Sequence, residues 1–313
     1  MRMFDRSTVQ LTCVLAGTLI FGSGAFAQQA SQRPQPIVAW SAQPVQANEW
    51  TAPHKPHWKL SEVLAKHSGE RSWQEDIVSD RDFVARYISM APGEKTKRQF
   101  FADDRVFWIV QSGRMRVSID GQEPFVASRG FMVQVPYRIP YSIETVGSEP
   151  SLRFEVTGAQ AVPLFPLEET PTPVAGKKYV KVSFTGSGAY DEVNKPYLDF
   201  NKAVVAANGR GGPFVKDDKT FANIIRGPGS APPPASNLGH FHVGYSEFWL
   251  VLEGKIDYQI EGVPFFTAEP GDVVYAPQGR WHRASWGGNG MATRLAINPR
   301  PEGMHNFQPP EAH

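Results

Sequence analysis

Two stretches of the chain resemble each other. The residues FWIVQSGRMRVSIDG begin at Phe107, and FWLVLEGKIDYQIEG begins at Phe248. Each stretch is followed by a segment in which five residues separate a glycine from a proline, at residues 130–136 and 271–277. A repeat over this span indicates two copies of one domain, and a length of 313 residues is enough to hold both.

Both copies consist of short segments in which apolar and polar residues alternate, with glycine and proline between them. This alternation is typical of β-strands, and closely spaced strands without intervening helices favour antiparallel barrels or sandwiches. Helical spacing of apolar residues is found at residues 60–67. The expected strands are Phe107–Val110, Arg114–Ile119, Phe131–Val135, Leu152–Val156, Tyr179–Phe184, Thr220–Ile225, Glu247–Leu252, Lys255–Ile260, Val273–Tyr275 and Thr293–Ile297.

The composition outside these segments predicts the domain borders. Residues 28–57 are rich in glutamine and proline and are expected to form an irregular leader. An N-terminal barrel is expected at residues 58–165 and a C-terminal barrel at residues 178–300, joined by a proline-containing linker at residues 166–177. Residues 301–313 are expected to form an irregular tail.

Residues 1–27 have the pattern of a secretory signal peptide. Arg2 and Arg6 precede an apolar run at residues 11–21, and small residues at the end of the segment predict cleavage after Ala27. The alternative, an uncleaved membrane anchor, is disfavoured because the apolar run is too short to span a bilayer. The mature protein is therefore expected in the periplasm or outside the cell, with no stable insertion in the membrane.

Composition excludes several classes of partner and chemistry. The one cysteine, Cys13, lies within the predicted signal peptide, so the mature chain would offer no thiolate as a metal ligand or nucleophile. The 32 basic and 31 acidic residues almost balance, which gives no support for binding nucleic acid or an anionic membrane. A small-molecule substrate or ligand is the expected partner.

The second copy carries a cluster of potential metal ligands. His240 and His242 are two residues apart, so that on a strand both side chains point to one face. Glu247 follows after a short turn. The segment that begins at Gly271 ends in a further histidine, His282.

These two segments resemble the two sequence motifs of the cupin superfamily. The first motif is His-x-His, a short gap, Glu and then Gly, and the second is Gly, five residues, Pro-x-Gly, two residues and His. The chain departs from the family at two flanking positions, which hold Pro234 and Trp286. The resemblance implies an all-β protein of two tandem jelly-roll-like cupin barrels with few short helices. It also implies one divalent metal, held by the motif residues His240, His242, Glu247 and His282.

Three imidazoles and a carboxylate suit Fe, Mn, Ni, Cu or Zn, and the ligand set does not choose among them. In an octahedral ion two positions would stay open for a substrate, and Glu247 is the candidate catalytic residue, as ligand or general base. Trp249, Tyr258 and Arg280 are expected to line the substrate pocket. The other histidines lie in irregular or terminal segments and are expected to be solvated: His54, His57, His67, His305 and His313.

The first copy lacks these ligands. With the same spacing, Gln99 and Phe101 stand where the histidine pair should be, Val106 replaces the glutamate and Tyr141 replaces the last histidine. The glycines and the proline of the turns remain. The first barrel is therefore expected to fold without this metal, and to support the second barrel or help form a homodimer.

Three functions remain open at this stage. A metal-dependent enzyme of the oxygenase or lyase type, acting on a small organic molecule, fits the intact ligand set best. A non-catalytic protein that binds a small molecule or sugar with the help of the metal is the main alternative, and a structural or storage role ranks last. Bicupin decarboxylases and flavonol-cleaving dioxygenases are similar in architecture, but two-site decarboxylases keep ligands in both barrels.

Overall fold

The computed structural model describes residues 37–229, 237–299 and 305–307. The chain divides into a short N-terminal unit, Met1–Ala39, and a body, Trp40–His313. The predicted signal peptide, with Cys13, lies outside the described residues, so its prediction stays untested. Within the described residues, no helix has the length and apolar character needed to cross a membrane.

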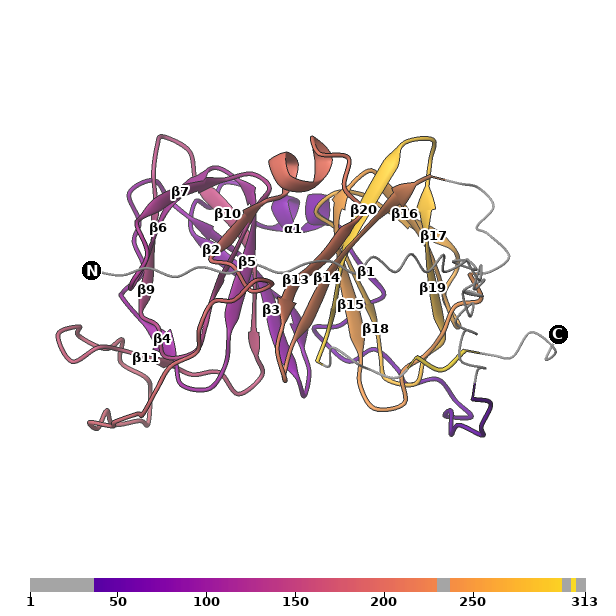
Figure 1. Ribbon diagram of the computed structural model, residues 1–313, viewed down its shortest axis with the longest axis horizontal. Helices are drawn as coiled ribbons and strands as arrows, with labels where there is room; N and C mark the ends of the chain where they lie inside the picture. The colour runs from indigo at the N-terminus through magenta and orange to yellow at the C-terminus, as the bar shows by residue number, and fades with distance from the viewer. Residues whose placement is uncertain (1–36, 230–236, 300–304, 308–313) are drawn as a thin grey trace, which may run out of the picture. The chain divides into compact units, whose positions relative to one another are not determined.

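The first half of the body forms a barrel-like sandwich (Figure 1, indigo to magenta). A six-stranded sheet with the order β12-β8-β5-β10-β3-β2 faces a three-stranded sheet with the order β7-β6-β9, and β11 pairs with β4. The strands are β2 (Trp73–Ser79), β3 (Phe83–Met90), β4 (Phe100–Phe101), β5 (Val106–Ser112), β6 (Arg114–Ile119), β7 (Phe125–Ser128), β8 (Phe131–Val135), β9 (Tyr141–Thr145), β10 (Ser151–Gly158), β11 (Pro163–Leu164) and β12 (Tyr197–Asp199).

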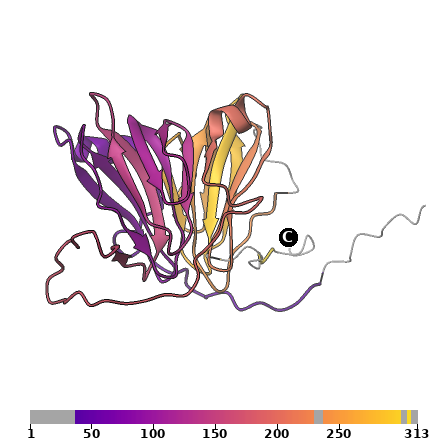
Figure 2. The same ribbon diagram turned by 60° about the vertical axis from the view of Figure 1, so that its left-hand side comes forward.

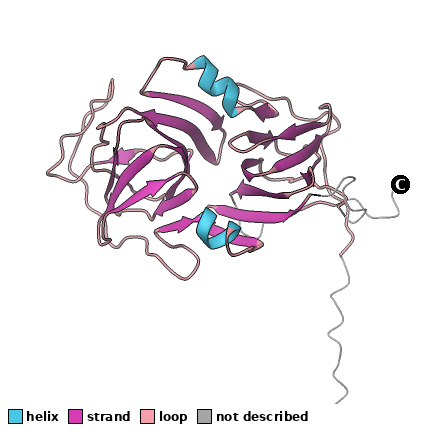
Figure 3. Cartoon of the chain, turned by 90° about the horizontal axis from the view of Figure 1, so that it is seen from above, coloured by secondary structure: helices cyan, strands magenta, loops and turns pink. Residues whose placement is uncertain are grey.

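The second half repeats this arrangement (Figure 1, orange to yellow). Its six-stranded sheet has the order β1-β18-β15-β20-β14-β13, and its three-stranded sheet has the order β17-β16-β19. Two short helices flank the sheets, as Figure 3 shows from above. The elements are β1 (His57–Trp58), α1 (Leu60–Lys66), the π-helix η1 (Asn201–Val205), β13 (Gly211–Lys216), β14 (Phe221–Pro228), β15 (Glu247–Glu253), β16 (Lys255–Ile260), β17 (Phe266–Ala268), β18 (Val273–Ala276), β19 (His282–Gly287) and β20 (Met291–Asn298).

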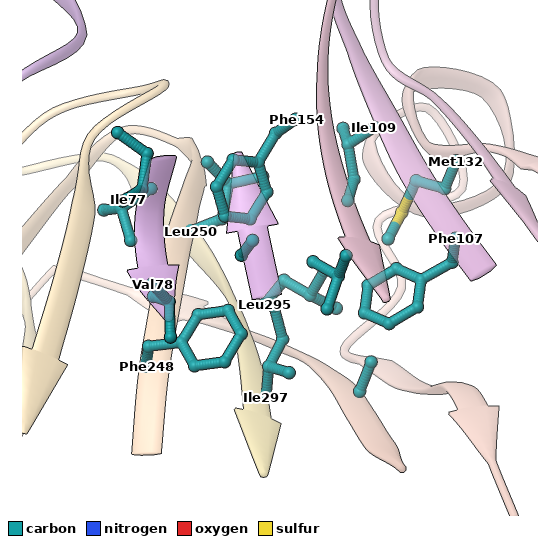
Figure 4. Packing of buried hydrophobic residues seen from close by; sticks show 14 of the residues in the cluster. Ile77, Val78, Phe107, Ile109, Met132, Phe154, Phe248, Leu250, Leu295 and Ile297 are labelled. Carbon is teal, nitrogen blue, oxygen red and sulfur yellow. The ribbon is translucent and has the colours of Figure 1, made fainter. Parts of the chain in front are cut away.

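The largest hydrophobic core lies between the two six-stranded sheets (Figures 2 and 4). Ile109 of β5 and Leu250 of β15 belong to this shared core, while their neighbours Trp108 and Trp249 face the separate cores of the two barrels. Successive side chains of a strand point to opposite faces, so β5 and β15 are buried on both sides. This explains why both read as continuous apolar runs in the sequence.

The turns that begin the second strand of each repeat depend on glycine. Gly113 (φ 71°) and Gly254 (φ 66°) both adopt a left-handed backbone conformation. A Cβ atom at Gly113 would lie 2.3 Å from the carbonyl oxygen of Pro150, and one at Gly254 would lie 2.3 Å from that of Met291. Because only glycine fits both the conformation and the space, the sequence repeat keeps it at both positions.

Each six-stranded sheet takes one edge strand from the other half of the chain. β12 follows the linker but pairs with β8 of the first barrel, and β1 precedes the first barrel but pairs with β18 of the second. The leader also contacts the second barrel, because the indole nitrogen of Trp50 donates to the carbonyl oxygen of Tyr275 (3.2 Å). The domain borders expected from the sequence stay predictions, since strand pairing interleaves the two halves there.

Most expected elements are present, including the helix at residues 60–66, but one expected strand is wrong. Tyr179–Phe184 forms no strand, and its apolar side chains are exposed. No neighbouring strand pairs with this segment, and its aromatic rings contact single side chains instead: Phe184 lies 6.1 Å from Phe100, and Tyr179 lies 6.0 Å from Phe165. Alternation alone cannot show whether a pairing partner exists.

The expectation that the N-terminal histidines are solvated is also wrong. His57 contacts a carboxylate oxygen of Asp272 at 2.8 Å. His54 stacks on Tyr275 with ring centroids 4.3 Å apart. His67 stacks on Trp73 at 4.3 Å. His57 lies in β1, His67 directly follows α1, and contacts with neighbouring residues partly bury all three rings.

Glu253 of β15 forms hydrogen bonds to two neighbouring strands and so connects three strands of the second barrel. Its carboxylate accepts two hydrogen bonds from Arg226 of β14 (2.8 and 3.2 Å) and one from Thr293 of β20 (2.7 Å). Burial raises the pKa of Glu253, but the bonds to Arg226 and Thr293 outweigh it and leave the pKa below its ordinary value. The ionised form is therefore the one that stabilises the fold.

We expect Glu253→Gln to lower the free energy of unfolding by about 1–3 kcal/mol at pH 7. Because the folded-state pKa is lowered, this difference is present above the unfolded-state pKa and disappears as the pH falls through the folded-state pKa. Urea unfolding at pH 7 and in steps below pH 5 measures it. Glu269→Gln, at an exposed pair with Lys255, is the control and should change stability little. An equal loss at every pH would contradict the assignment.

Candidate metal centre

Two strand contacts bring the four candidate ligands together. His240 pairs with His282, the first residue of β19, through an isolated β-bridge with backbone N–O distances of 2.9 Å in both directions. Glu247 is the first residue of β15, and its backbone lies opposite Ala276 of β18. His242 lies two residues after His240 and points to the same face.

The ligand atoms converge on one point. All four residues offer an atom within 4.8 Å of the others. Glu247 Oε2 lies 2.9 Å from Nε2 of His242, 3.3 Å from that of His282 and 3.6 Å from that of His240. The Nε2 atoms of His240 and His282 are buried and have no hydrogen-bond partner among the described residues. Buried donors and acceptors without partners are rare, and a metal ion is the partner that fits three imidazoles and a carboxylate.

The protonation states suit a cation. Burial raises the pKa of Glu247, but the three surrounding histidines outweigh it and hold the pKa well below its ordinary value. The pKa of His240 is lowered, first by burial and then by the neighbouring His282 and His242, although Glu247 opposes the shift. At neutral pH the site therefore offers an ionised carboxylate and a neutral His240, which are the forms that bind metal.

Backbone contacts orient the imidazole of His282. Its Nδ1 donates to the carbonyl oxygen of Arg280 at 3.0 Å, which leaves Nε2 as the coordinating atom. The indole of Trp249 lies beside the ring, with centroids 5.0 Å apart. His240 has the most accessible side chain of the four, 23% exposed against 5% or less for the others, so its side of the site is the least buried.

Of the three expected pocket residues, two lie next to this site. Trp249 contacts His282, and Tyr258 lies 5.5 Å from Trp249 in the interior of the barrel. Arg280 does not face the site. Its guanidinium donates to the backbone oxygens of Asn48 and Glu261 and lies 3.9 Å from the ring centre of Trp50, so it anchors the leader to the barrel. The expectation for Arg280 failed because the motif gives no information on a leader that folds back.

A further histidine, which the sequence alone did not indicate, lies near the site. The ring of His305 lies 4.5 Å from that of His240 and 4.7 Å from that of His242. The backbone of Asn306 pairs with that of Phe241 and holds this part of the tail in place. His305 is exposed, as expected for a residue in an irregular tail, and the pairing of Asn306 with Phe241 brings its ring beside the candidate ligands.

The first barrel preserves the geometry but not the ligands. Gln99 and Tyr141 form the isolated bridge that corresponds to the bridge between His240 and His282. Trp108 corresponds to Trp249 and stacks on Tyr141 at 5.6 Å. Within the described residues, the only cluster suited to a metal ion is therefore the one in the second barrel.

Comparison with known proteins agrees with this architecture. Residues 229–298 match the Cupin domain family. The fold is similar to that of the Cupin 2 conserved barrel domain protein from Leptotrichia buccalis, with a TM-score of 0.52 and 13% identity over 83% of this chain and 100% of the other. It is also similar to a variant of oxalate decarboxylase from Bacillus subtilis, with a TM-score of 0.51 and 12% identity over 84% and 81%. No curated protein matches the sequence.

Fold and site together define a β-protein of two repeated barrels with one His3Glu cluster. The chain is a cupin-fold protein whose second barrel matches the Cupin domain, and the resemblance seen in the sequence motifs is confirmed. At identities of 12–13%, the similar structures establish the fold alone.

We expect the protein to bind about one divalent transition metal per chain, and His240→Ala combined with His282→Ala to abolish the binding. Two of the four ligands are then missing, while the other two cannot close a site on their own. Elemental analysis of protein purified without an affinity tag measures the stoichiometry. His67→Ala, which removes a histidine outside the cluster, should leave the metal content unchanged. Full metal occupancy in the double variant would refute the assignment.

Proposed function

We propose that the protein is an exported, metal-dependent enzyme of the oxygenase or lyase type that acts on a small organic molecule. The observation that carries this proposal is the cluster of four converging ligand atoms, two of them buried without a hydrogen-bond partner in the described part of the chain. Three histidines and one glutamate leave positions free on an octahedral ion, and the least buried side of this site is that of His240. A divalent metal bound there would supply Lewis acidity or oxygen activation.

The residues of the chain would divide the remaining tasks. His240, His242 and His282 would hold the ion, and Glu247 would serve as the fourth ligand or accept a proton at Oε2. Trp249 and Tyr258 would form the wall of the site and exclude water from one side. The similar decarboxylase shows only that a two-barrel cupin fold is compatible with catalysis.

A second candidate is a protein that binds a small molecule or sugar with the help of the metal and does not convert it. The observation in its favour is the loss of all four ligand positions in the first barrel, since Gln99, Phe101, Val106 and Tyr141 stand there. One barrel of this chain therefore keeps the fold without the four candidate metal ligands.

The two candidates differ in turnover. We expect the metal-loaded protein to convert a substrate found by screening oxygen uptake and product formation across small organic acids, phenols and sugars. Glu247→Gln should lower kcat by about 100-fold or more, because it removes both a ligand charge and a proton acceptor. Tight ligand binding without any product on long incubation would refute the enzyme and favour the second candidate.

Export is a separate part of the proposal. It is supported by the charged, apolar and small residues in the first 27 positions, which lie outside the described part of the chain. Expressed in a bacterium with its complete sequence, the protein should appear in the periplasm or medium with Gln28 as its first residue. Intact-mass analysis of both fractions measures this, and replacement of Ala27 by a bulky residue should block cleavage. A full-length protein in the cytoplasm would contradict export.

A further inference from the structure

The second barrel contains an arginine that points into its interior. Arg294 of β20 lies directly opposite Val251 of β15 and Ile225 of β14. Side chains of directly opposed residues lie on one face of a sheet, and Val251 and Ile225 both belong to the core of this barrel. The guanidinium therefore lies on the same side of the sheet as Trp249, which contacts the metal ligand His282.

Arg294 is partly buried, and two of its three guanidinium nitrogens are enclosed without a hydrogen-bond partner among the described residues. Its Nε and Nη1 atoms are buried and make no hydrogen bond with any described residue. The hydroxyl of Tyr258 and the indole nitrogen of Trp286 are likewise buried without partners, and the guanidinium lies 5.8 Å from the Trp286 ring centre. Burial lowers the pKa of Arg294, and the nearby carboxylate of Glu247 opposes this shift only in part. Several buried donors without partners inside one barrel favour the binding of an anion that can accept several hydrogen bonds.

The first barrel shows what this arginine binds when a partner is present. Arg153 occupies the corresponding position, opposite Val110 of β5, just as Arg294 lies opposite Val251. Its Nε donates to Oε2 of Glu155 at 2.8 Å, and both residues are buried. The first barrel thus pairs its inward arginine with a carboxylate of its own.

The second barrel lacks that carboxylate. Glu155 lies opposite Trp108 in the first barrel, and the residue opposite the corresponding Trp249 is Ala296. The barrel that kept its metal ligands has therefore lost the internal partner of its arginine. A carboxylate supplied from outside would take the place that Glu155 fills in the first barrel.

The position of Glu155 relates this place to the metal site. Glu155 lies directly opposite Trp108, and the ring of Trp108 stacks on that of Tyr141 with centroids 5.6 Å apart. Tyr141 stands where His282 stands in the second barrel. An anion held by Arg294 would accordingly lie close to His282 and the other metal ligands.

We propose that Arg294, together with Tyr258 and Trp286, forms a subsite for the carboxylate of a small organic acid beside the metal ligands. The proposal rests on the proposed function and narrows its substrate class to carboxylates. The planar fork of an arginine matches the two oxygens of a carboxylate, and neutral analogues cannot replace that contact. In the first barrel, the carboxylate of Glu155 occupies the position that the carboxylate of the ligand would occupy in the second barrel.

Titration calorimetry on metal-loaded protein tests the subsite. The probes are acetate, benzoate and succinate, each compared with its neutral amide. We expect each amide to bind at least about 10-fold more weakly than its acid. The guanidinium then donates to a neutral amide oxygen instead of a charged carboxylate, and that hydrogen bond is weaker. Arg294→Met should weaken binding of the acids by about 10- to 100-fold and leave binding of the amides unchanged. Lys255→Met, which removes an exposed positive charge from the same barrel, is the control and should bind like the wild type.

Ala296→Glu provides a second, independent test. It restores in the second barrel the carboxylate that Glu155 provides in the first, so it should satisfy Arg294 and abolish binding of the acids. Elemental analysis and circular dichroism of each variant show that the metal and the fold are retained. If Arg294→Met does not fold, the outcome for Ala296→Glu decides.

Different outcomes would contradict the carboxylate subsite and the proposed enzyme activity. Wild-type protein that holds metal but binds acids no better than amides would overturn the subsite and leave the metal site intact. Unchanged acid binding in Ala296→Glu would overturn it as well. Wild-type protein without metal would overturn the proposed function, and the same titration on metal-free protein would still show whether Arg294 selects carboxylates.

Discussion

The core between the two six-stranded sheets is the constraint on which the rest of the structure depends. It buries one face of β5 and β15, and the barrel interiors bury the other. A strand buried on both faces has a fixed register, because a shift of one residue would exchange every side chain between the two cores. Leu250 in the shared core therefore places Glu247, Trp249 and Val251 inside the second barrel. The geometry of the candidate metal site therefore depends on packing several residues away.

The two barrels share a scaffold and differ in what their interiors hold. The first has an uncharged set at the ligand positions and pairs Arg153 with Glu155. The second buries Glu247 among histidines and leaves two guanidinium nitrogens of Arg294 without a hydrogen-bond partner among the described residues. Buried charges without partners strongly destabilise a protein, so their presence in one barrel only is typical of a functional site. The first barrel offers an internal reference state for the second.

The ends of the chain complete the second barrel. Arg280 holds the leader through the backbone of Asn48, and β1 extends the six-stranded sheet at its edge. At the other end, the pairing of Asn306 with Phe241 brings His305 to the metal ligands. These contacts join residues more than 60 positions apart in the chain, and no local sequence pattern predicts them.

The sequence by itself determined the two barrels, their hairpin turns and the four candidate ligands, because these depend on local spacing: two histidines separated by one residue, and glycine where the backbone turns. It also predicted the loss of the ligands in the first copy. It could not determine that Tyr179–Phe184 lacks a pairing strand, that Arg280 faces the leader or that His305 reaches the site. Only the tertiary structure decided these, as it decided that Arg294 faces inward opposite an alanine instead of a glutamate. Pairing between distant segments sets the partners of a side chain, and one sequence does not specify that pairing locally.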